Sequence, residues 1–160
     1  MATQTAALGR FAAGAGRGLA AGLIGTGAMT LSSMAENKIR KRPPSTVPSE
    51  VVGKVMGVQP RGAEEKERFS NLIHWQFGTS LGLLRAALGG VGLRDPWAAG
   101  AFFAMVWAGE LIVVPQLSEK TPPVTEWEMT DVAIDGWHHL VFAAATSFAY
   151  TNLLKARVRG

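Results

Sequence analysis

The sequence predicts an all-α integral membrane protein: a four-helix antiparallel bundle with a long basic loop after its first helix. Three observations support this fold class. Four apolar segments each have about the ~20 residues that cross a ~30 Å hydrocarbon layer. Only 18% of the 160 residues are charged, whereas 48% are hydrophobic. The apolar segments lack a charged face, which is typical of buried or lipid-facing helices. We expect residues 1–160 to form a single transmembrane domain.

A soluble four-helix bundle is the alternative, because helices rich in Ala and Gly also form such bundles. The helices of a soluble bundle carry a charged face. The segment from Pro96 to Pro115, however, contains one charged residue, Glu110. So long an apolar run is the usual signature of a transmembrane helix. We therefore favour a multi-pass protein of the plasma (inner) membrane.

The first helix is expected over residues 18–34, "GLAAGLIGTGAMTLSSM". Arg10 and Arg17 precede it, and Ser33-Met34-Ala35 is a small-x-small pattern that a signal peptidase could accept. Because the run is rich in glycine and its basic leader is long, we interpret the segment as a retained helix rather than a cleaved signal.

The loop over residues 36–69 opens with the basic stretch "KIRKRPPSTVP". Prolines 43, 44 and 48 are expected to prevent helix there. Ser49 is then a candidate N-cap for a short helix along the membrane interface. Its apolar face would hold Val51, Val52, Val55 and Met56. Since the basic residues lie beside apolar runs, lipid headgroups fit them better than nucleic acid, and no nucleic-acid partner is expected.

The other helices are expected over residues 71–93, 96–115 and 136–154. The second should begin outside the membrane with "AEEKERF", in which Glu64 and Arg68 would pair at i,i+4. The acidic loop over 116–135 would emerge on the same side as the loop over 36–69. Lysine and arginine counts on the two sides leave the membrane orientation open.

The up-down path of the chain brings ionisable residues to one membrane face. They are Glu36, His74, Glu110 and His139, on stripes shared with small residues, and His139 is a better inward candidate than His138. Arg85 is the expected partner of Glu110, because an unpaired charge at this depth costs about 3 kcal/mol. Two G-x-x-x-G pairs are expected to pack the helices: Gly18 with Gly22, and Gly78 with Gly82.

This cluster is compatible with four kinds of chemistry. His74, His139 and Glu110 could bind Zn²⁺ or iron. The same residues could relay protons, because imidazole titrates near neutrality. His74 and His139 could ligate a haem, although no C-x-x-C-H motif is present. The favoured interpretation is that the imidazoles form hydrogen bonds near the interface and Glu110 bridges to Arg85 between helices.

Three stretches resemble the YagU-like family of small bacterial inner-membrane proteins. They are "GLAAGLIGTGAMTLSSMAENKIRKRPPS", "DPWAAGAFFAMVWAGELIVVPQLSEKTPPV" and "DGWHHLV". The shared features are Pro43-Pro44 after the first helix, the Thr121–Val124 motif, and an acid four residues before a histidine, Asp135 and His139. The long basic loop departs from the family in detail. The resemblance implies four membrane crossings and an inner-membrane location, and it implies no particular activity.

The sequence therefore favours a small membrane protein that acts as an accessory or interaction protein, with lipid and a second copy or another membrane protein as partners. Its rival is a proton- or metal-ion-handling protein that uses Glu110, His74 and His139. An enzyme is less favoured, since no nucleophile-base motif is present, and no cofactor is predicted. The chain has no cysteine, which excludes thiolate metal sites and a cysteine nucleophile.

Overall fold

The computed structural model describes residues 2–43, 46–58, 60–118 and 121–154. Pro44 and the basic tail after Leu154 lie outside these residues. The described chain is all α, as predicted, and contains no strand. Its elements are α1 (Ala2–Arg40), α2 (Val47–Met56), α3 (Ala63–Gly90), α4 (Trp97–Leu117), the 3-10 helix η1 (Val124–Glu126), α5 (Met129–Phe148) and the π-helical turn η2 (Ala149–Leu153).

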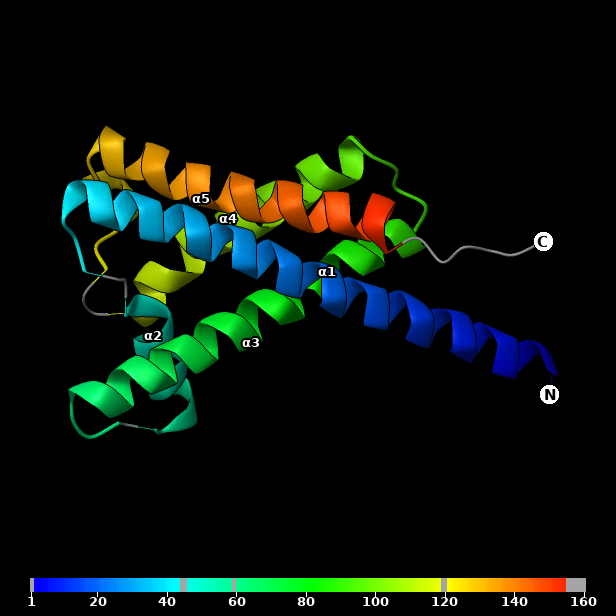
Figure 1. Ribbon diagram of the computed structural model, residues 1–160, viewed down its shortest axis with the longest axis horizontal. Coiled ribbons are helices and arrows are strands. Elements are labelled where there is room, and N and C mark those ends of the chain that lie inside the picture. The colour runs from blue at the N-terminus through cyan, green and yellow to red at the C-terminus, as the bar shows by residue number, and fades with distance from the viewer. Residues whose placement is uncertain (1, 44–45, 59, 119–120, 155–160) are drawn as a thin grey trace.

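Helix α1 lies between α3 and α5 and contacts both, whereas α4 packs mainly against α5 (Figure 1). The short helix α2 covers part of α3. Contacts between neighbouring helices follow opposite residue orders. Along α1, for example, Gly25 faces Thr146 and the later Ser32 faces His138. Residues that are far apart in the sequence therefore lie beside each other where two helices touch.

Helix α1 is much longer than the predicted segment 18–34. It extends toward the N-terminus because the leader "ATQTAALGRFAAGAG" is rich in Ala and contains no proline. At its other end an ion pair of 3.4 Å joins Glu36 to Arg40, one turn apart. The helix stops at Lys41, whose φ of 54° is left-handed, just before the prolines. The start of the predicted basic loop is thus helical.

Helix α2 begins before the predicted N-cap Ser49. Its N-cap is Thr46, and Pro48 lies in its first turn, where a missing N–H does no harm. Ser49 is buried, and its Oγ donates to the Thr46 carbonyl oxygen at 2.7 Å. Proline at this position therefore starts a helix rather than preventing one.

Helix α3 begins at Ala63, and the predicted i,i+4 pair forms, with Arg68 Nη2 2.6 Å from Glu64 Oε1. Helix α4 matches the predicted segment 96–115 within two residues at its C-terminal end. Helix α5 starts at Met129, well before the expected residue 136. No proline or glycine stands between Glu128 and Asp135, so the acidic stretch continues the helix.

Helices α1 and α3 touch backbone to backbone at the four glycines of the predicted packing motifs. A Cβ added to Gly18 would lie 2.6 Å from the carbonyl oxygen of Gly82, and a Cβ on Gly82 would collide with the Gly18 carbonyl. Gly22 meets Gly78 and Thr79 in the same way. Only residues without a side chain permit so close an approach.

The helices bury few large side chains. The main apolar cluster joins Phe102 and Val106 of α4 to Phe142 and Ala143 of α5, and Ala21, Ala149 and Tyr150 form a second, smaller one. Many large apolar side chains instead point outward. Exposed examples on each long helix are Leu23 and Leu31 on α1, Leu72 and Phe77 on α3, Ile112 and Val113 on α4, and Leu140 and Phe148 on α5.

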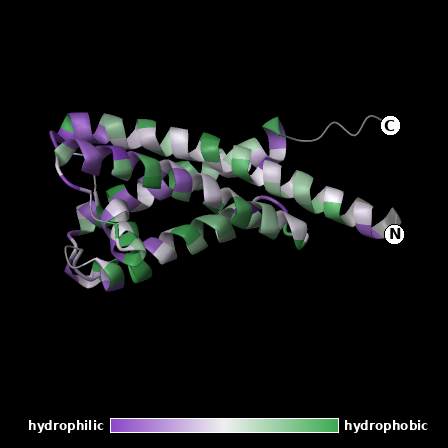
Figure 2. Cartoon of the chain, turned by 90° about the horizontal axis from the view of Figure 1, so that it is seen from below, coloured by the Kyte–Doolittle hydropathy of each residue, from purple (hydrophilic) through white to green (hydrophobic). Residues whose placement is uncertain are grey.

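Two helical segments of the described chain are long and apolar enough to cross a membrane: Phe11–Arg40 and Trp97–Leu117. The second has only 11% of its most apolar window buried. Figure 2 shows hydrophobic residues along much of the helices, with hydrophilic ones concentrated at the end of the bundle where α1 leads into α2.

Candidate functional site

The polar residues predicted to cluster form separate contacts between different helix pairs. His74, on α3, faces α1: its Nε2 and Thr30 Oγ1 are joined by a hydrogen bond of 2.9 Å. Its ring meets Trp75 edge-on, with centroids 6.2 Å apart. Glu110 and His139 lie on α4 and α5, whereas the hydrogen-bond partner of His74 lies on α1. The α1–α3 contact therefore takes His74 away from the other predicted members of the cluster.

Glu110 and His139 do come together, across the contact between α4 and α5. The two groups interact electrostatically, and Asp135 acts on both. His139 Nδ1 donates to the Asp135 carbonyl oxygen at 2.9 Å and lies 3.5 Å from Asp135 Oδ2. Trp107 Nε1 donates to the same carboxylate at 2.9 Å. Two acids, one imidazole and one indole thus share a half-buried site.

This arrangement follows from local spacing. Asp135 and His139 are one turn apart on α5, so their side chains lie on the same face. Gly136 gives the indole of Trp107 room, since a Cβ there would lie 2.9 Å from its Cζ2 atom. Glu110 is three residues after Trp107 and projects from the same side of α4. The sequence pattern Asp-Gly-x-x-His therefore builds one half of this site.

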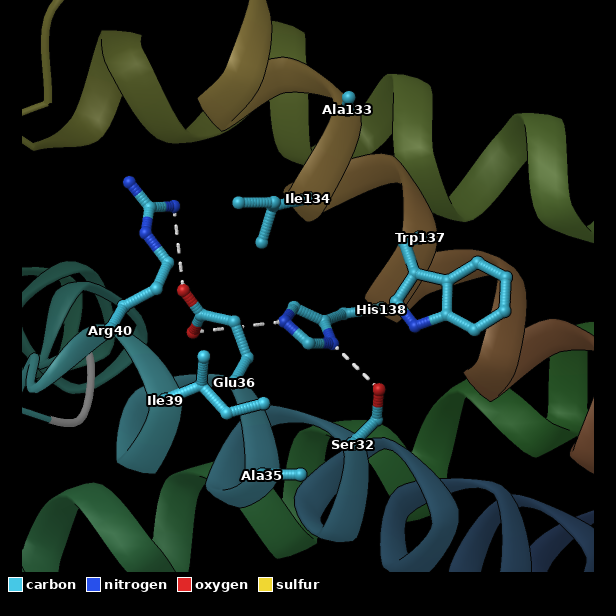
Figure 3. A pocket seen from close by; sticks show the side chains of 9 residues that line it. All are labelled: Ser32, Ala35, Glu36, Ile39, Arg40, Ala133, Ile134, Trp137 and His138. Carbon is cyan, nitrogen blue, oxygen red and sulfur yellow. Dashed lines mark hydrogen bonds and ion pairs between the residues drawn. The ribbon is translucent and has the colours of Figure 1, made fainter.

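Glu36 and His138 form a second acid–imidazole pair, at the contact between α1 and α5. His138 Nε2 lies 4.0 Å from Glu36 Oε2, and its Nδ1 is hydrogen-bonded to Ser32 Oγ at 3.0 Å. The pair borders an open groove of about 510 Å³, shown in Figure 3. His138 and His139 are each 8% exposed, and these adjacent histidines face two different neighbours of α5, helix α1 and helix α4. His139 is inward, as predicted, and His138 is buried as well.

The predicted pairing of Arg85 with Glu110 is also wrong. Arg85 is 2% exposed, and its Nη2 lies 2.8 Å and 3.0 Å from the two carboxylate oxygens of Asp95. Its Nε donates to Ser147 Oγ at 3.0 Å. Asp95 lies in the short α3–α4 connection, ten residues after Arg85. Its carboxylate, and not that of Glu110, therefore pairs with the guanidinium.

An aromatic ring completes the surroundings of Arg85. The guanidinium carbon of Arg85 lies 4.7 Å from the centroid of the Tyr150 ring, and that of Arg17 lies 3.9 Å from it. Thr151 accepts from Arg85 at 3.2 Å and donates to Asp95 at 2.6 Å. The buried cation is therefore held by α5, η2 and the α3–α4 connection.

The three predicted metal ligands, His74, His139 and Glu110, do not form one group. Within the residues that the structure describes, no three His, Asp or Glu side chains are placed to hold one metal ion together. Glu36, also predicted for the cluster, contacts His138 and Arg40 instead. Glu36 with His138, and Glu110 and Asp135 with His139, thus form two separate acid–imidazole groups, and His74 belongs to neither.

Sequence reasoning missed Asp95 and Tyr150 as partners of Arg85, and Ser32 as the partner of His138. Asp95 could have been found, because its short connection brings it back toward Arg85, ten residues before it. Ser32 carried no distinguishing signal. Which residue of α5 Ser32 contacts depends on how α1 and α5 are rotated against each other.

No protein-family model, curated protein or solved structure matched this chain.

Proposed function

We propose that the chain is a multi-pass integral membrane protein, an antiparallel bundle of α1, α3, α4 and α5, that acts through association with other membrane components. The observation that carries this proposal is the outward apolar surface on all four long helices. Soluble monomers rarely expose a contiguous apolar patch larger than a few hundred Å². Lipid chains would cover these side chains. We also propose that the chain is related to the YagU-like proteins that its sequence resembles.

The polar contacts support a role in holding helices together. Trp107 with Asp135, Thr30 with His74, and Arg85 with Asp95 each join neighbouring segments by a hydrogen bond of 2.8–2.9 Å. Hydrogen bonds between transmembrane helices contribute roughly 0.6–2 kcal/mol each. These side chains are thus occupied in packing, which favours an accessory protein over an enzyme.

The first part of α1 supports the association half of the proposal. This helical arm, Ala2–Gly16, extends beyond the other helices in Figure 1. Leu8 and Phe11 are 68% and 75% exposed, and Gly9 and Gly14 face open space. A helix of this length is marginal in water unless an apolar face packs against something. Lipid together with a second copy or another membrane protein would provide that surface.

The membrane proposal is tested by single-cysteine labelling, which is clean because the natural chain has no cysteine. Thr125→Cys lies in η1 and Val91→Cys in the α3–α4 connection, and both native residues are exposed. A membrane-impermeant maleimide should label them from opposite sides of the membrane, with Thr125→Cys matching Arg42→Cys. Labelling of Thr125→Cys and Arg42→Cys from opposite sides would contradict the proposed topology.

Association is tested by crosslinking in native membranes. Phe11→Cys should crosslink to a second copy or another membrane protein. The control is Ile112→Cys, at an exposed residue of α4. The protein that carries it should show little crosslinked product. Equal crosslinking at both positions would mean that the arm has no special role.

A second candidate function is favoured by one observation, the approach of Glu110 to His139 and Asp135 between α4 and α5. Paired carboxylate and imidazole groups inside a membrane can pass protons. Proteoliposomes containing a pH-sensitive dye would then acidify under an imposed potential. Glu110→Gln should abolish that flux, whereas Glu128→Gln, at an exposed residue before α5, should not. No flux in the unmodified protein would remove this candidate.

A further inference from the structure

The groove between α1 and α5 has three kinds of surface in one place. Its floor holds Glu36 and His138, one rim holds Arg40, and its walls are apolar (Figure 3). The wall residues Ile39 and Trp137 are 81% and 57% exposed, so they offer bare apolar surface. A ligand that fits all three surfaces must carry a cation, an anion and a hydrocarbon chain.

Two polar atoms at the floor of the groove lack a hydrogen-bond partner. Glu36 Oε1 and His138 Nε2 are buried atoms without a hydrogen-bond partner among the described residues. The gap of 4.0 Å between His138 Nε2 and Glu36 Oε2 is too long for a direct hydrogen bond. When the proton of His138 is on Nδ1, donated to Ser32 Oγ, Nε2 becomes an acceptor facing a carboxylate. A cationic donor beside this pair would give His138 Nε2 a hydrogen bond and would also donate to the Glu36 carboxylate, whose Oε1 otherwise has only Arg40 nearby, at 3.4 Å.

The distance between His138 Nε2 and Glu36 Oε2 decides which kind of cation fits between them. Zn²⁺ binds nitrogen and carboxylate oxygen at about 2.0–2.2 Å with tetrahedral angles, which places two ligand atoms roughly 3.4 Å apart. The observed 4.0 Å exceeds this distance. Ca²⁺ and Mg²⁺ take oxygen ligands and do not use imidazole. A primary ammonium, which has three donor hydrogens and accepts longer contacts, fits better.

The rim of the groove provides the opposite charge. Arg40 and Arg42 share one carboxylate oxygen, Asp131 Oδ1, at 3.3 Å and 3.2 Å. Lys38 and Lys41 are exposed in the same stretch. Positive charge therefore exceeds negative charge here, and arginine is well suited to bind phosphate. Arg40 is also 3.4 Å from Glu36, so the cationic and anionic binding groups are adjacent.

We propose that this groove binds an aminophospholipid: the primary ammonium lies between Glu36 and His138, the phosphate contacts Arg40, and the acyl chain lies along Ile39 and Trp137. Phospholipids with an ethanolamine headgroup have this combination of groups. The trimethylated headgroup of phosphatidylcholine has no N–H to donate, so it should bind less well. This inference rests on the proposed membrane location, because a lipid reaches the groove only from a bilayer.

The test uses the full chain, purified in detergent micelles that contain equal amounts of phosphatidylethanolamine and phosphatidylcholine with the same acyl chains. Native mass spectrometry then counts the lipid retained. We expect phosphatidylethanolamine to be preferred about tenfold, which corresponds to ~1.4 kcal/mol. Equal retention of the two lipids would overturn the proposal.

The variants locate the preference. Glu36→Gln keeps the shape of the side chain and should abolish the preference while phosphatidylcholine retention is unchanged. Glu64→Gln is the matched control, since Glu64 pairs with Arg68 on the exposed start of α3, and it should behave as the natural chain does. His138→Asn should weaken the preference in the same direction as Glu36→Gln. A preference that persists in Glu36→Gln would place the lipid elsewhere and overturn the assignment.

Two further probes distinguish a bound lipid headgroup from a soluble amine and from a metal ion. Displacement by free ethanolamine would indicate a soluble amine rather than a lipid, and Zn²⁺ retained by the natural chain but not by Glu36→Gln would indicate a metal site. Either result overturns the proposal. A chain that labels as a membrane protein yet shows no lipid preference refutes the lipid site alone. A chain recovered as a soluble protein refutes both proposals.

Discussion

The two ends of α5 handle buried charge differently. Near its end, Arg85 makes hydrogen bonds to Asp95, Ser147 and Thr151 and lies over the Tyr150 ring. Near its start, Glu36 and His138 stand 4.0 Å apart beside an open groove. The first cluster is closed off by the chain's own side chains, although Arg85 Nη1 has no hydrogen-bond partner among the described residues, whereas the second is incomplete on the side that opens onto the groove. The enclosed cluster stabilises the fold, and the one beside the open groove is accessible to a ligand.

The largest expected effect comes from opening the closed cluster. Asp95→Ala leaves the Arg85 cation buried without its carboxylate, and breaking such a pair destabilises a protein by about 3–5 kcal/mol. The free energy of unfolding can be measured by denaturant titration in detergent, followed by circular dichroism.

The matched control is Asp131→Ala, which removes an acid from exposed ion pairs and should change stability by less than ~1 kcal/mol. Equal losses for Asp95→Ala and Asp131→Ala would mean that Arg85 does not depend on Asp95.

The glycine contact of α1 with α3 lies next to the closed cluster, since Gly18 follows Arg17 and Gly82 precedes Arg85 by three residues. Gly82→Ala forces the two backbones apart, which should destabilise the fold by about 1–3 kcal/mol. It should also alter the surroundings of Tyr150, which is the one tyrosine of the chain. The ¹⁹F resonance of 3-fluorotyrosine would report this change directly.

Gly90→Ala is the control for this experiment, because a Cβ there meets nothing within 4 Å. We expect no shift of the resonance and unchanged or slightly higher stability. A shift caused by Gly90→Ala but not by Gly82→Ala would contradict the link between the helix contact and the Arg85 cluster.

The contact between α4 and α5 should show an intermediate effect. Trp107→Phe removes the N–H that donates to Asp135 at 2.9 Å, and hydrogen bonds to charged acceptors contribute about 1.5–3 kcal/mol. Trp127→Phe removes a similar bond to the Pro122 carbonyl, but an exposed one, and should lose less than ~1 kcal/mol. The same denaturant titration compares them. Equal losses would argue that Asp135 is not positioned by Trp107.

The smallest expected effect is at the incomplete cluster. Glu36→Gln should change the free energy of unfolding by no more than ~0.5 kcal/mol in lipid-free detergent, because the carboxylate has only loose partners at 3.4 Å and 4.0 Å. Thermal unfolding of the two proteins, measured in parallel, tests this expectation. A loss as large as that of Asp95→Ala would show that Glu36 completes a structural cluster rather than a binding groove.

The sequence predicts the helix content, but only some of the helix boundaries. The apolar run with proline at both ends predicted α4 within two residues at its end, and the Glu64–Arg68 spacing predicted an i,i+4 pair. The predicted and observed helix boundaries differ at proline and at acidic residues. Pro48 was expected to prevent helix and instead lies in the first turn of α2. The stretch before residue 136 is predicted to be loop, although no proline or glycine stands between Glu128 and Asp135 to break a helix.

The sequence by itself determined that the chain is helical, that the long helices lack a charged face, and that acids and histidines lie near the ends joined by the long loops. These are consequences of composition and periodicity along one chain. Only the tertiary structure decided the pairs: Arg85 with Asp95, Glu110 with His139, and Glu36 with His138. Partner choice depends on how helices rotate and slide against one another, which is set by side-chain packing at distant residues such as Gly18 and Gly82.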